Sequence, residues 1–597
     1  MKIINEYIYK HSFIIILIFF ICVFLTIKFT WLGTDGKGYT RIIDSDGKGY
    51  YLYLPNIFLN NSISKQTIDN RYILNFNGAG ANKYYIGTAI AMAPFFGLGY
   101  LGASIGGYER DGYSPPFQIA ISIAGLIYLI IGLYFLKEFL KLYEVKKSII
   151  AIVLIIIVFG TNLITYAIIS PSMSHVYSWC FITAFLYNIK KLFIEKRIKN
   201  FRWGMVILGF IIILRPTNGI IILIIPFLAG TYYNLIKTFK FIFSLRNVIK
   251  GITLFLMVIF IQPFLWYIQT GSYFIQSYKN EGFNFLEPQI WNVLFSFRKG
   301  LFIYTPIILL SLLGLITLRK KKFELYSLVF FLIALTYLIS SWWNWYYGPS
   351  FGQRTFVEFY GIGGLLIALL FKNTVKRLYN SVLIGISFLF VSLNLIQNYQ
   401  YYLNILSAWD MNFMKYKYVF LKTSSSYIGC LGGNNDMVPY HNEMRLIYSN
   451  RDDFEKENLN TIVNYCKYDS ISKSNVCDYT FREFNVELFI PVDSSFINQR
   501  CAYAELSIDR MELEYYSCTN ALVVIEIANK EGQNYFYYTF PINEIPEKEI
   551  FVWKTYQYKI ELPIIRNPDD VMIIYIWNKK IQSFYIDNFN IKYYRIS

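Results

Sequence analysis

The feature that most constrains this chain is a series of long apolar runs within its first 400 residues. A helix needs about 20 mainly apolar residues to cross the ~30 Å hydrocarbon core of a bilayer. Such runs lie near 12–32, 115–136, 148–168, 174–189, 203–230, 251–270, 301–318, 324–341, 355–371 and 380–398. Because an arginine is costly in lipid, we interpret 203–230, which contains Arg215-Pro216-Thr217-Asn218, as two short helices meeting at a polar break. The sequence therefore predicts an α-helical polytopic domain, residues 1–400, with about eleven transmembrane helices.

The distribution of charge indicates membrane topology and argues against a nucleic-acid partner. The formal net charge is +17, to which residues 1–400 contribute +22 and residues 401–597 contribute −5. If the N-terminus is cytoplasmic, every predicted inner segment is basic, as the positive-inside rule requires. These segments lie near 2–10, 137–147, 190–202, 237–250, 319–322 and 372–377. We therefore expect a multi-pass protein of a bacterial-type plasma (inner) membrane with a cytoplasmic N-terminus.

The positive-inside rule also decides whether the apolar segment 84–106 spans the membrane. A spanning helix here would place the basic segment 137–147 outside and invert every later loop. Its Gly and Pro residues also suit an interfacial or re-entrant helix better than a straight span. We therefore expect a large first outer loop, residues 33–114, that contains this interfacial helix.

The tail after residue 400 has a different pattern. Short runs with period-2 alternation, separated by turn residues, lie at 502–508, 522–527, 534–540, 555–562, 571–577 and 583–594. Strands at this spacing predict an extracytoplasmic (periplasmic) all-β sandwich over 481–597, with 401–480 as a connector. Five cysteines lie in the tail (Cys430, Cys466, Cys477, Cys501 and Cys518), so up to two disulfides are expected, with a pairing that sequence does not define.

Acidic side chains are scarce in the predicted outer segments. Asp44 and Asp46 follow the first helix in a stretch rich in glycine and aromatic residues, Asp44-Ser45-Asp46-Gly47-Lys48-Gly49-Tyr50. A carboxylate at the bilayer surface, beside glycines that admit a ligand, is a candidate general base. The alternative is that these residues form only a solvated turn.

Basic residues on the outer face run against the positive-inside rule and call for an explanation. Lys83, Arg298 and Arg354 lie at predicted outer loop–helix junctions, together with Lys299, and Arg215 lies at the polar break. An anionic headgroup or phosphate would explain them, with arginine the better bidentate ligand. The alternative is that one or two of them extend to lipid phosphates.

Two further signals concern substrate contact and metals. The aromatic stretch 342–347 is typical of an interfacial belt, although a ring such as Trp345 is a candidate for stacking on a sugar. His175, at an outer helix end, is a candidate for ligand binding or proton transfer, against the alternative of a structural histidine. No cluster of His, Asp and Glu has metal-ligand spacing, so no metal site is expected.

These motifs, in this order, resemble the GT-C superfamily of integral-membrane glycosyltransferases, which includes protein O-mannosyltransferases and lipid A aminoarabinose transferases. Asp46-Gly47-Lys48-Gly49-Tyr50 is similar to the family's Asp-Glu-x-x-Tyr, with Gly47 in place of the second acid. Residues 82–87 resemble its juxtamembrane segment without the proline pair, and 297–306 its loop-to-helix junction. Residues 342–354 resemble a late Trp-x-x-Trp…Gly-x-Arg element. The tail resembles a jelly-roll carbohydrate-binding module, at the level of fold alone.

The resemblance implies an inverting glycosyltransferase of cell-envelope glycan biosynthesis, using a polyprenyl-phosphate-linked sugar as donor and a glycan, lipid or protein hydroxyl as acceptor. Asp46 would be the base, with Asp44 as the alternative. Phosphate ligands would be Lys83 and Arg354, helped by Arg298 or His175, and substrate contacts would come from Tyr50 and Trp345. A divalent metal would be compatible with the family but has no support in the residues. The rival interpretations are a transporter or flippase for lipid-linked sugars, an O-antigen polymerase or ligase, and a non-enzymatic surface-assembly protein.

Overall fold

The structure is a computed structural model. It describes residues 2–60, 72–76, 78–278, 281–374, 376–434, 444–456, 458, 460–490, 492, 502–516, 521–563, 565 and 567–596. The chain divides into two compact units. We call Met1–Tyr347 with Phe351–Asn398 the membrane unit, and Gly348–Ser350 with Tyr399–Ser597 the C-terminal unit. Each is described by itself.

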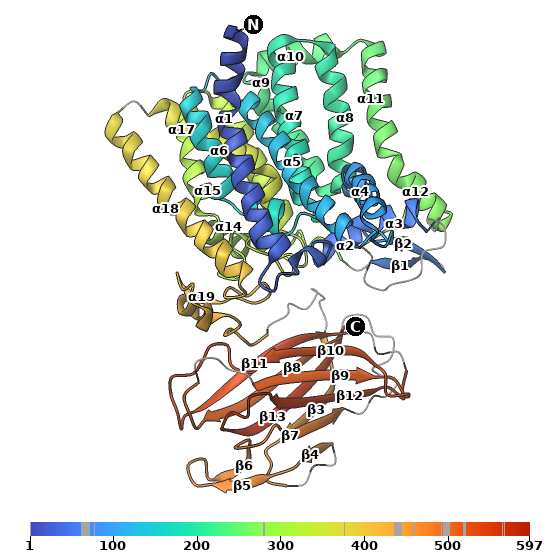
Figure 1. Ribbon diagram of the computed structural model, residues 1–597, viewed down its shortest axis with the longest axis vertical. Coiled ribbons are helices and arrows are strands. Elements are labelled where there is room, and N and C mark those ends of the chain that lie inside the picture. Colours follow the sequence, from blue (N-terminus) through green and yellow to red (C-terminus); the bar gives the residue numbers. More distant parts are fainter. Residues whose placement is uncertain are drawn as a thin grey trace. The chain divides into compact units, whose positions relative to one another are not determined.

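The membrane unit is a bundle of helices (Figure 1). The α-helices of ten residues or more are α1 (Lys2–Leu25), α4 (Gly87–Gly106), α5 (Pro115–Lys141), α6 (Lys147–Phe159), α7 (His175–Glu195), α8 (Ile198–Leu214), α10 (Tyr232–Ile242), α11 (Leu245–Ile259), α12 (Ile261–Thr270), α16 (Lys322–Ser340), α17 (Tyr360–Asn373) and α18 (Arg377–Tyr402). The shorter ones are α2 (Asp46–Tyr51), α3 (Tyr53–Phe58), α9 (Ile225–Ala229), α13 (Ile290–Phe295), α14 (Leu301–Tyr304) and α15 (Pro306–Leu312).

Among the described residues, seven helices are long and apolar enough to cross a membrane, or eight if a pair bent by 115° counts as one span. Six of the seven coincide with predicted spans: Phe13–Leu32, Pro115–Lys141, Leu245–Thr270, Lys322–Ser340, Arg354–Asn373 and Arg377–Tyr402. The predicted spans 148–168, 203–230 and 301–318 form helices that are shorter or interrupted. The span 174–189 lies in the 21-residue α7, which meets the test of length but not that of composition. The run 203–230 does break as expected, since α8 ends at Leu214 and a 3-10 helix, Pro216–Ile224, begins after Arg215.

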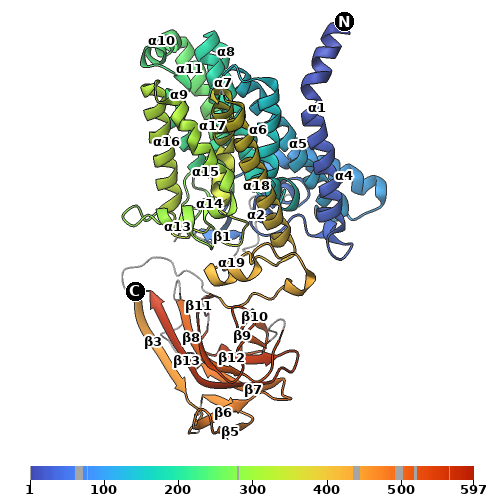
Figure 2. The same cartoon turned by 90° about the vertical axis from the view of Figure 1, so that its left-hand side faces the viewer.

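The seventh candidate is α4, which passes the test of length and composition although we expect it to be interfacial. Figures 1 and 2 show α4 lying across the direction of the long helices. It lies at the bundle end that also holds α2, α3 and the hairpin of β1 (Ile73–Phe76) and β2 (Ala79–Asn82). This orientation agrees with an interfacial helix, whose placement in the bilayer stays a prediction.

The C-terminal unit is a β-sandwich whose strand pairs are all antiparallel. Its strands are β3 (Met444–Asp452), β4 (Thr461–Val463), β5 (Cys466–Asp469), β6 (Ser474–Asp478), β7 (Phe484–Ile490), β8 (Ala502–Glu512), β9 (Ala521–Ala528), β10 (Asn534–Pro541), β11 (Trp553–Leu562), β12 (Val571–Asn578) and β13 (Phe584–Ile596). One sheet has the order β10-β9-β12-β7-β4, and the other β11-β8-β13-β6-β5 with β3 also paired to β13. Consecutive strands from β7 to β13 alternate between the sheets except at the hairpin β9–β10, which is the order of a jelly roll.

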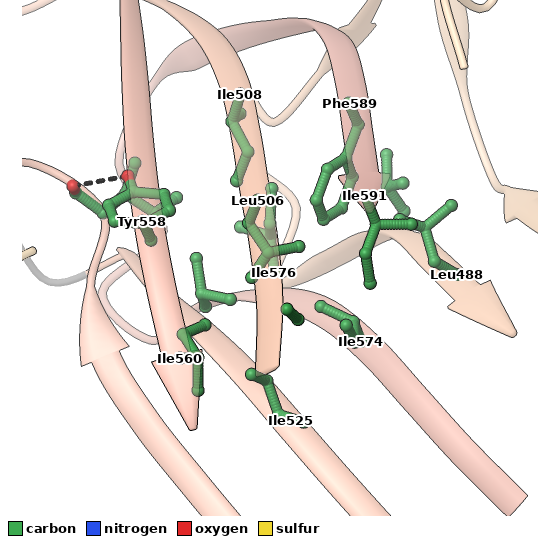
Figure 3. Close-up of a cluster of buried hydrophobic side chains, with 14 of the residues drawn as sticks. Leu488, Leu506, Ile508, Ile525, Tyr558, Ile560, Ile574, Ile576, Phe589 and Ile591 are labelled. Carbon is green, nitrogen blue, oxygen red and sulfur yellow. Dashed lines mark hydrogen bonds between the residues drawn. The ribbon is translucent and has the colours of Figure 1, made fainter. Parts of the chain in front are cut away.

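Alternating residues of both sheets form the core of the sandwich (Figure 3). Ile525 and Ile574 of one sheet are buried with Leu506, Ile560 and Ile591 of the other, each at most 1% exposed. The six strands predicted from alternation are confirmed as β8 to β13, because in a half-buried strand every second side chain enters the core.

The sandwich begins earlier than expected. The stretch 401–480, predicted as a connector, supplies β3, β4, β5 and β6 to the two sheets, so the boundary at 481 is wrong. β4 and β5 are only three and four residues long. Strands this short do not show the alternation that reveals β8 to β13, and so sequence periodicity misses them.

Candidate active site

The candidate site is built around the first turn of α2, which begins at Asp46. The glycines of this segment allow close packing: a β-carbon at Gly47 would collide with Ser172, and one at Gly49 with the ring of Tyr84. Ser172 in turn donates a hydrogen bond to the carbonyl of Ile42, 2.9 Å away. The backbone of α2 is thereby held against the chain that precedes α7.

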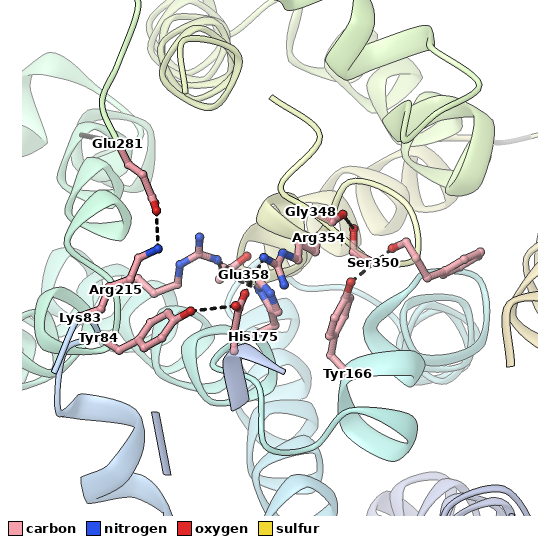
Figure 4. Close-up of polar contacts among 12 residues, drawn as sticks. Lys83, Tyr84, Tyr166, His175, Arg215, Glu281, Gly348, Ser350, Arg354 and Glu358 are labelled. Atoms are coloured by element: carbon pink, nitrogen blue, oxygen red, sulfur yellow. Dashed lines mark hydrogen bonds and ion pairs between the residues drawn. The ribbon is translucent and has the colours of Figure 1, made fainter. Parts of the chain in front are cut away.

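Asp46 is the centre of a polar network that includes Tyr84 and Arg354, both labelled in Figure 4. Its Oδ2 accepts a hydrogen bond from Arg354 Nη2 at 2.7 Å, and its Oδ1 accepts one from the Tyr84 hydroxyl at 2.8 Å. Burial would raise the pKa of the Asp46 carboxyl, but the charges of Arg354 and Lys83 and these two hydrogen bonds hold that pKa below its usual value. Asp46 is therefore an ionised carboxylate, and 32% of its side chain remains exposed.

Lys83 lies on the same side of the network, directly after β2. It forms an ion pair with Glu281, which comes from the loop between α12 and α13. Its ammonium group also lies 5.2 Å from the ring centroid of Tyr278 and 5.9 Å from that of Tyr84. Lys83 is thus held beside the tyrosine that donates to Asp46.

A second group of charges lies next to the first. Glu358 is fully buried, and its Oε1 contacts His175 Nδ1 at 2.9 Å and accepts a hydrogen bond from Arg215 Nη1 at 2.8 Å. Arg354 and Glu358 belong to one 3-10 helix, Arg354–Phe359. This helix therefore carries a residue of each group.

Tyr50 joins the two groups. Its ring packs on that of Tyr84, with centroids 4.5 Å apart, and it is within electrostatic range of Arg215, Asp46 and Arg354. The spacing from Asp46 to Tyr50 that the sequence singles out places the tyrosine one helical turn below the carboxylate. The cluster thus contains three cations, three carboxylates and several tyrosines.

The other candidate residues have different contacts. Asp44 is exposed, and its backbone carbonyl accepts a hydrogen bond from the Lys48 amide at 3.3 Å. Arg298 lies 3.6 Å from the ring centroid of Tyr346, and the buried Trp345 packs edge-on against that same ring at 5.7 Å. Asp44 and Asp46 were the two predicted candidates for the base. Among the described residues, Asp46 is the one that contacts Arg354.

The sequence assigns no role to Glu358 or Glu281. It places Arg215 at the polar break among the cations that a phosphate would explain, without naming it as a phosphate ligand. A usable signal was present, because charged residues inside apolar runs are expensive and pair with one another. Arg215 and Glu358 are two such residues and are partners. Among the described residues, no group of three or more His, Cys, Asp or Glu side chains could hold a metal ion.

No protein-family model matches this chain, and no curated protein matches it either. Among solved structures it is similar to arabinosyltransferase EmbB from Mycobacterium smegmatis, with a TM-score of 0.38 and 11% identity over 92% of this chain and 62% of that one. It is also similar to the Archaeoglobus fulgidus oligosaccharyltransferase, with a TM-score of 0.43 and 12% identity over 68% of this chain and 57% of that one.

The chain therefore spans about three fifths of each of these solved chains.

Proposed function

We propose that the membrane unit transfers a sugar from a polyprenyl-phosphate-linked donor to an acceptor hydroxyl, with inversion at the anomeric carbon. The observation that carries the proposal is the contact of Asp46 with Arg354 inside a cluster that also holds Lys83 and Arg215. A base next to fixed cations is what displacement of a phosphate leaving group needs. The cluster lies at one end of a helical bundle, where the phosphate of a lipid in a bilayer would be found.

In the proposed reaction, Asp46 accepts the proton of the acceptor hydroxyl while its oxygen attacks the anomeric carbon. The bond between that carbon and the phosphate oxygen breaks on the opposite face, so the configuration inverts. The electron pair leaves with the phosphate, which becomes a monoester with one more negative charge. Arg354 and Lys83 would offset that charge because they are already in place when it develops.

Because Arg354 and Lys83 already have carboxylate partners, Asp46 would become available as a base only when the donor phosphate binds. In the structure Arg354 is bound to Asp46, and Lys83 to Glu281. A phosphate that enters would compete for both cations and so release the Asp46 carboxylate towards the acceptor. Tyr50 would line the sugar position, and we keep Trp345, Arg298 and His175 as predicted contributors to substrate binding.

The outer-face orientation, a glycan or lipid acceptor, and carbohydrate binding by the β-sandwich are parts of the same proposal. A glycan-binding sandwich on the same chain would raise the local concentration of acceptor without a new contact at the site.

The test is sugar transfer by the purified protein from a panel of polyprenyl-phosphate sugars. We expect Asp46→Asn to lower the rate by about 10²–10⁴-fold, the usual contribution of a positioned general base. Asp44→Asn, two residues away and exposed, is the matched control and should retain the rate. Transfer by Asp46→Asn at the wild-type rate would contradict the mechanism, and loss in Asp44→Asn alone would assign the base to Asp44.

A further inference from the structure

The residue that this scheme leaves unused is Arg215, at the break between α8 and the following 3-10 helix. Pro216 disfavours helical backbone at the residue before it, and Arg215 is extended, with φ −154° and ψ 116°. The Arg215 side chain therefore projects from the chain just after α8 ends. A charged side chain placed in this way within an apolar run needs a partner or a function.

One corner of the Arg215 guanidinium is anchored. Nη1 donates to Glu358 Oε1 at 2.8 Å and lies 3.3 Å from His175 Nδ1. Glu358 is fully buried and His175 is 1% exposed. Because both partners are enclosed, Arg215 cannot move away without removing the cation that Glu358 is paired with, and a buried carboxylate without a cation is strongly unfavourable.

The opposite edge of the same guanidinium is open. The side chain of Arg215 is 19% exposed, whereas its partner Glu358 is 0% exposed. Within the described residues, its side-chain contacts engage Nη1 alone, which leaves Nε and Nη2 to donate elsewhere. A guanidinium fixed at one corner, with its remaining donors facing accessible space, is preorganised to bind phosphate in a bidentate manner.

The open edge of the Arg215 guanidinium lies in the same part of the site as Asp46. Tyr50 is within electrostatic range of Arg215, Arg354 and Asp46 together, and the two guanidinium groups are within range of each other (Figure 4). Their mutual repulsion is offset by Glu358 and Asp46 in the structure. A bound phosphate would offset it directly.

We infer that Arg215 binds the phosphate of the polyprenyl-linked donor, and that Glu358 and His175 position it. This inference rests on the proposed function and assigns His175 to orienting Arg215 instead of touching phosphate. The alternative role for the three residues is purely structural, as an internal ion pair that stabilises the break after α8. The two roles differ in one respect, because only the first links Arg215 to affinity for a phosphate.

The experiment measures the dissociation constant of an undecaprenyl monophosphate probe for the full chain in nanodiscs, together with the melting temperature. We expect Arg215→Gln to weaken binding by about tenfold or more, and Arg215→Lys at least about fivefold, since lysine keeps the charge but loses the fork. Glu358→Gln, which removes the charge that orients Arg215, should also weaken binding. Arg110→Gln, an exposed arginine of the first outer loop, is the matched control and should bind as the wild type does.

Wild-type affinity in Arg215→Gln, or in Arg215→Lys if the glutamine variant does not fold, would overturn the inference. Failure of the proposed function has a different signature. In that case the wild type and Asp46→Asn would both bind the probe through Arg215, and neither would transfer a sugar. Sugar transfer by Arg215→Gln with the wild-type KM for donor would contradict the phosphate role while leaving Asp46 in place.

Discussion

At the scale of single residues, the proposed mechanism needs Asp46 to be ionised and yet to accept a proton. Its pKa is lowered by Arg354, Lys83 and the Tyr84 hydroxyl, so the carboxylate is ready at neutral pH but is a weak base while Arg354 stays bound. Competition from the donor phosphate for Arg354 resolves these opposing requirements. The base would gain strength only when the leaving group is bound.

The lowered pKa of Asp46 determines how kcat/KM for sugar transfer should depend on pH. A carboxyl group with a lowered pKa stays ionised as the pH falls, until the pH reaches that lowered value, below the ordinary Asp value of about 3.9. Since kcat/KM reports the free enzyme, we expect no loss of kcat/KM from Asp46 between pH 7 and pH 5. A kcat/KM profile for sugar transfer over this range is the measurement. An acidic limb with a midpoint between 5 and 7 that disappears in Asp46→Glu would contradict it.

The residues of the site were only partly predictable. Asp46, Lys83 and Arg354 were found because acids are scarce, and basic residues unexpected, in predicted outer segments. Glu358 was passed over because it stands in an apolar run without a motif, and its role depends on Arg215, which is 143 residues away. Sequence spacing carries no information on such a long-range pair.

At the scale of elements, α2 is a short helix whose position depends on small residues. Gly47 and Gly49 let its backbone touch Ser172 and Tyr84, and Tyr84 donates to Asp46. The glycines read in the sequence as room for a ligand are therefore used, at least in part, for packing within the site.

Gly49→Ala tests this packing. A methyl group here has no room beside the Tyr84 ring, so we expect a destabilisation of about 1–3 kcal/mol together with reduced sugar transfer. Thermal or denaturant unfolding and transfer assays would measure the two effects. Gly97→Ala in α4, where a β-carbon meets nothing within 4 Å, is the control and should be close to neutral. Equal effects of the two substitutions would contradict the packing argument.

Strands were predictable where apolar and polar residues alternate in the sequence, and length alone did not decide it, since the nine-residue β3 was missed. β8 to β13 show every second side chain entering the core, and the sequence revealed all six. β5 and β6 form a hairpin of four- and five-residue strands, and no alternation was visible there. β6 joins the sheet by pairing with β13, a contact between residues more than 100 positions apart, and β5 joins it through β6.

The β5–β6 hairpin also places two cysteines opposite each other. Cys466 and Cys477 are register partners, with their sulfur atoms 3.0 Å apart, and both are free thiols, whereas Cys430 is disulfide-bonded. In an oxidising compartment we expect these two thiols to form a disulfide, since no backbone movement is needed to bring them together. Intact mass and alkylation of protein isolated from membranes would measure this. Full alkylation of both thiols without reduction would contradict an extracytoplasmic, oxidising location for the tail.

At the scale of the whole molecule, the order of the helices and the positions of the basic segments between them were the most predictable features. The basic segments separate apolar runs that the structure forms as helices, and the boundary between the units near residue 400 follows from the change in composition. The count of spans is less direct, because α6, α8 and the helices around Pro216 and Pro306 are short or interrupted. At one of these breaks, before Pro216, Arg215 enters the site.

The topology can be tested with reporter fusions. With a cytoplasmic N-terminus and α4 at the interface, a reporter fused at residue 320 should be cytoplasmic and one fused after residue 400 extracytoplasmic. Paired alkaline phosphatase and fluorescent-protein fusions would measure this. A fluorescent, phosphatase-negative fusion after residue 400 would show that α4 spans the membrane and that every later loop is inverted.

If Asp46 drives consumption of a lipid-linked sugar, the pool of such lipids reports on that step directly. In cells whose only copy of this protein carries Asp46→Asn, mass spectrometry of extracted lipids should show one polyprenyl monophosphate sugar accumulating relative to the wild type. The species that accumulates would also identify the donor. An unchanged profile of polyprenyl-phosphate sugars, with the variant protein present at its normal level in the membrane, would contradict the account.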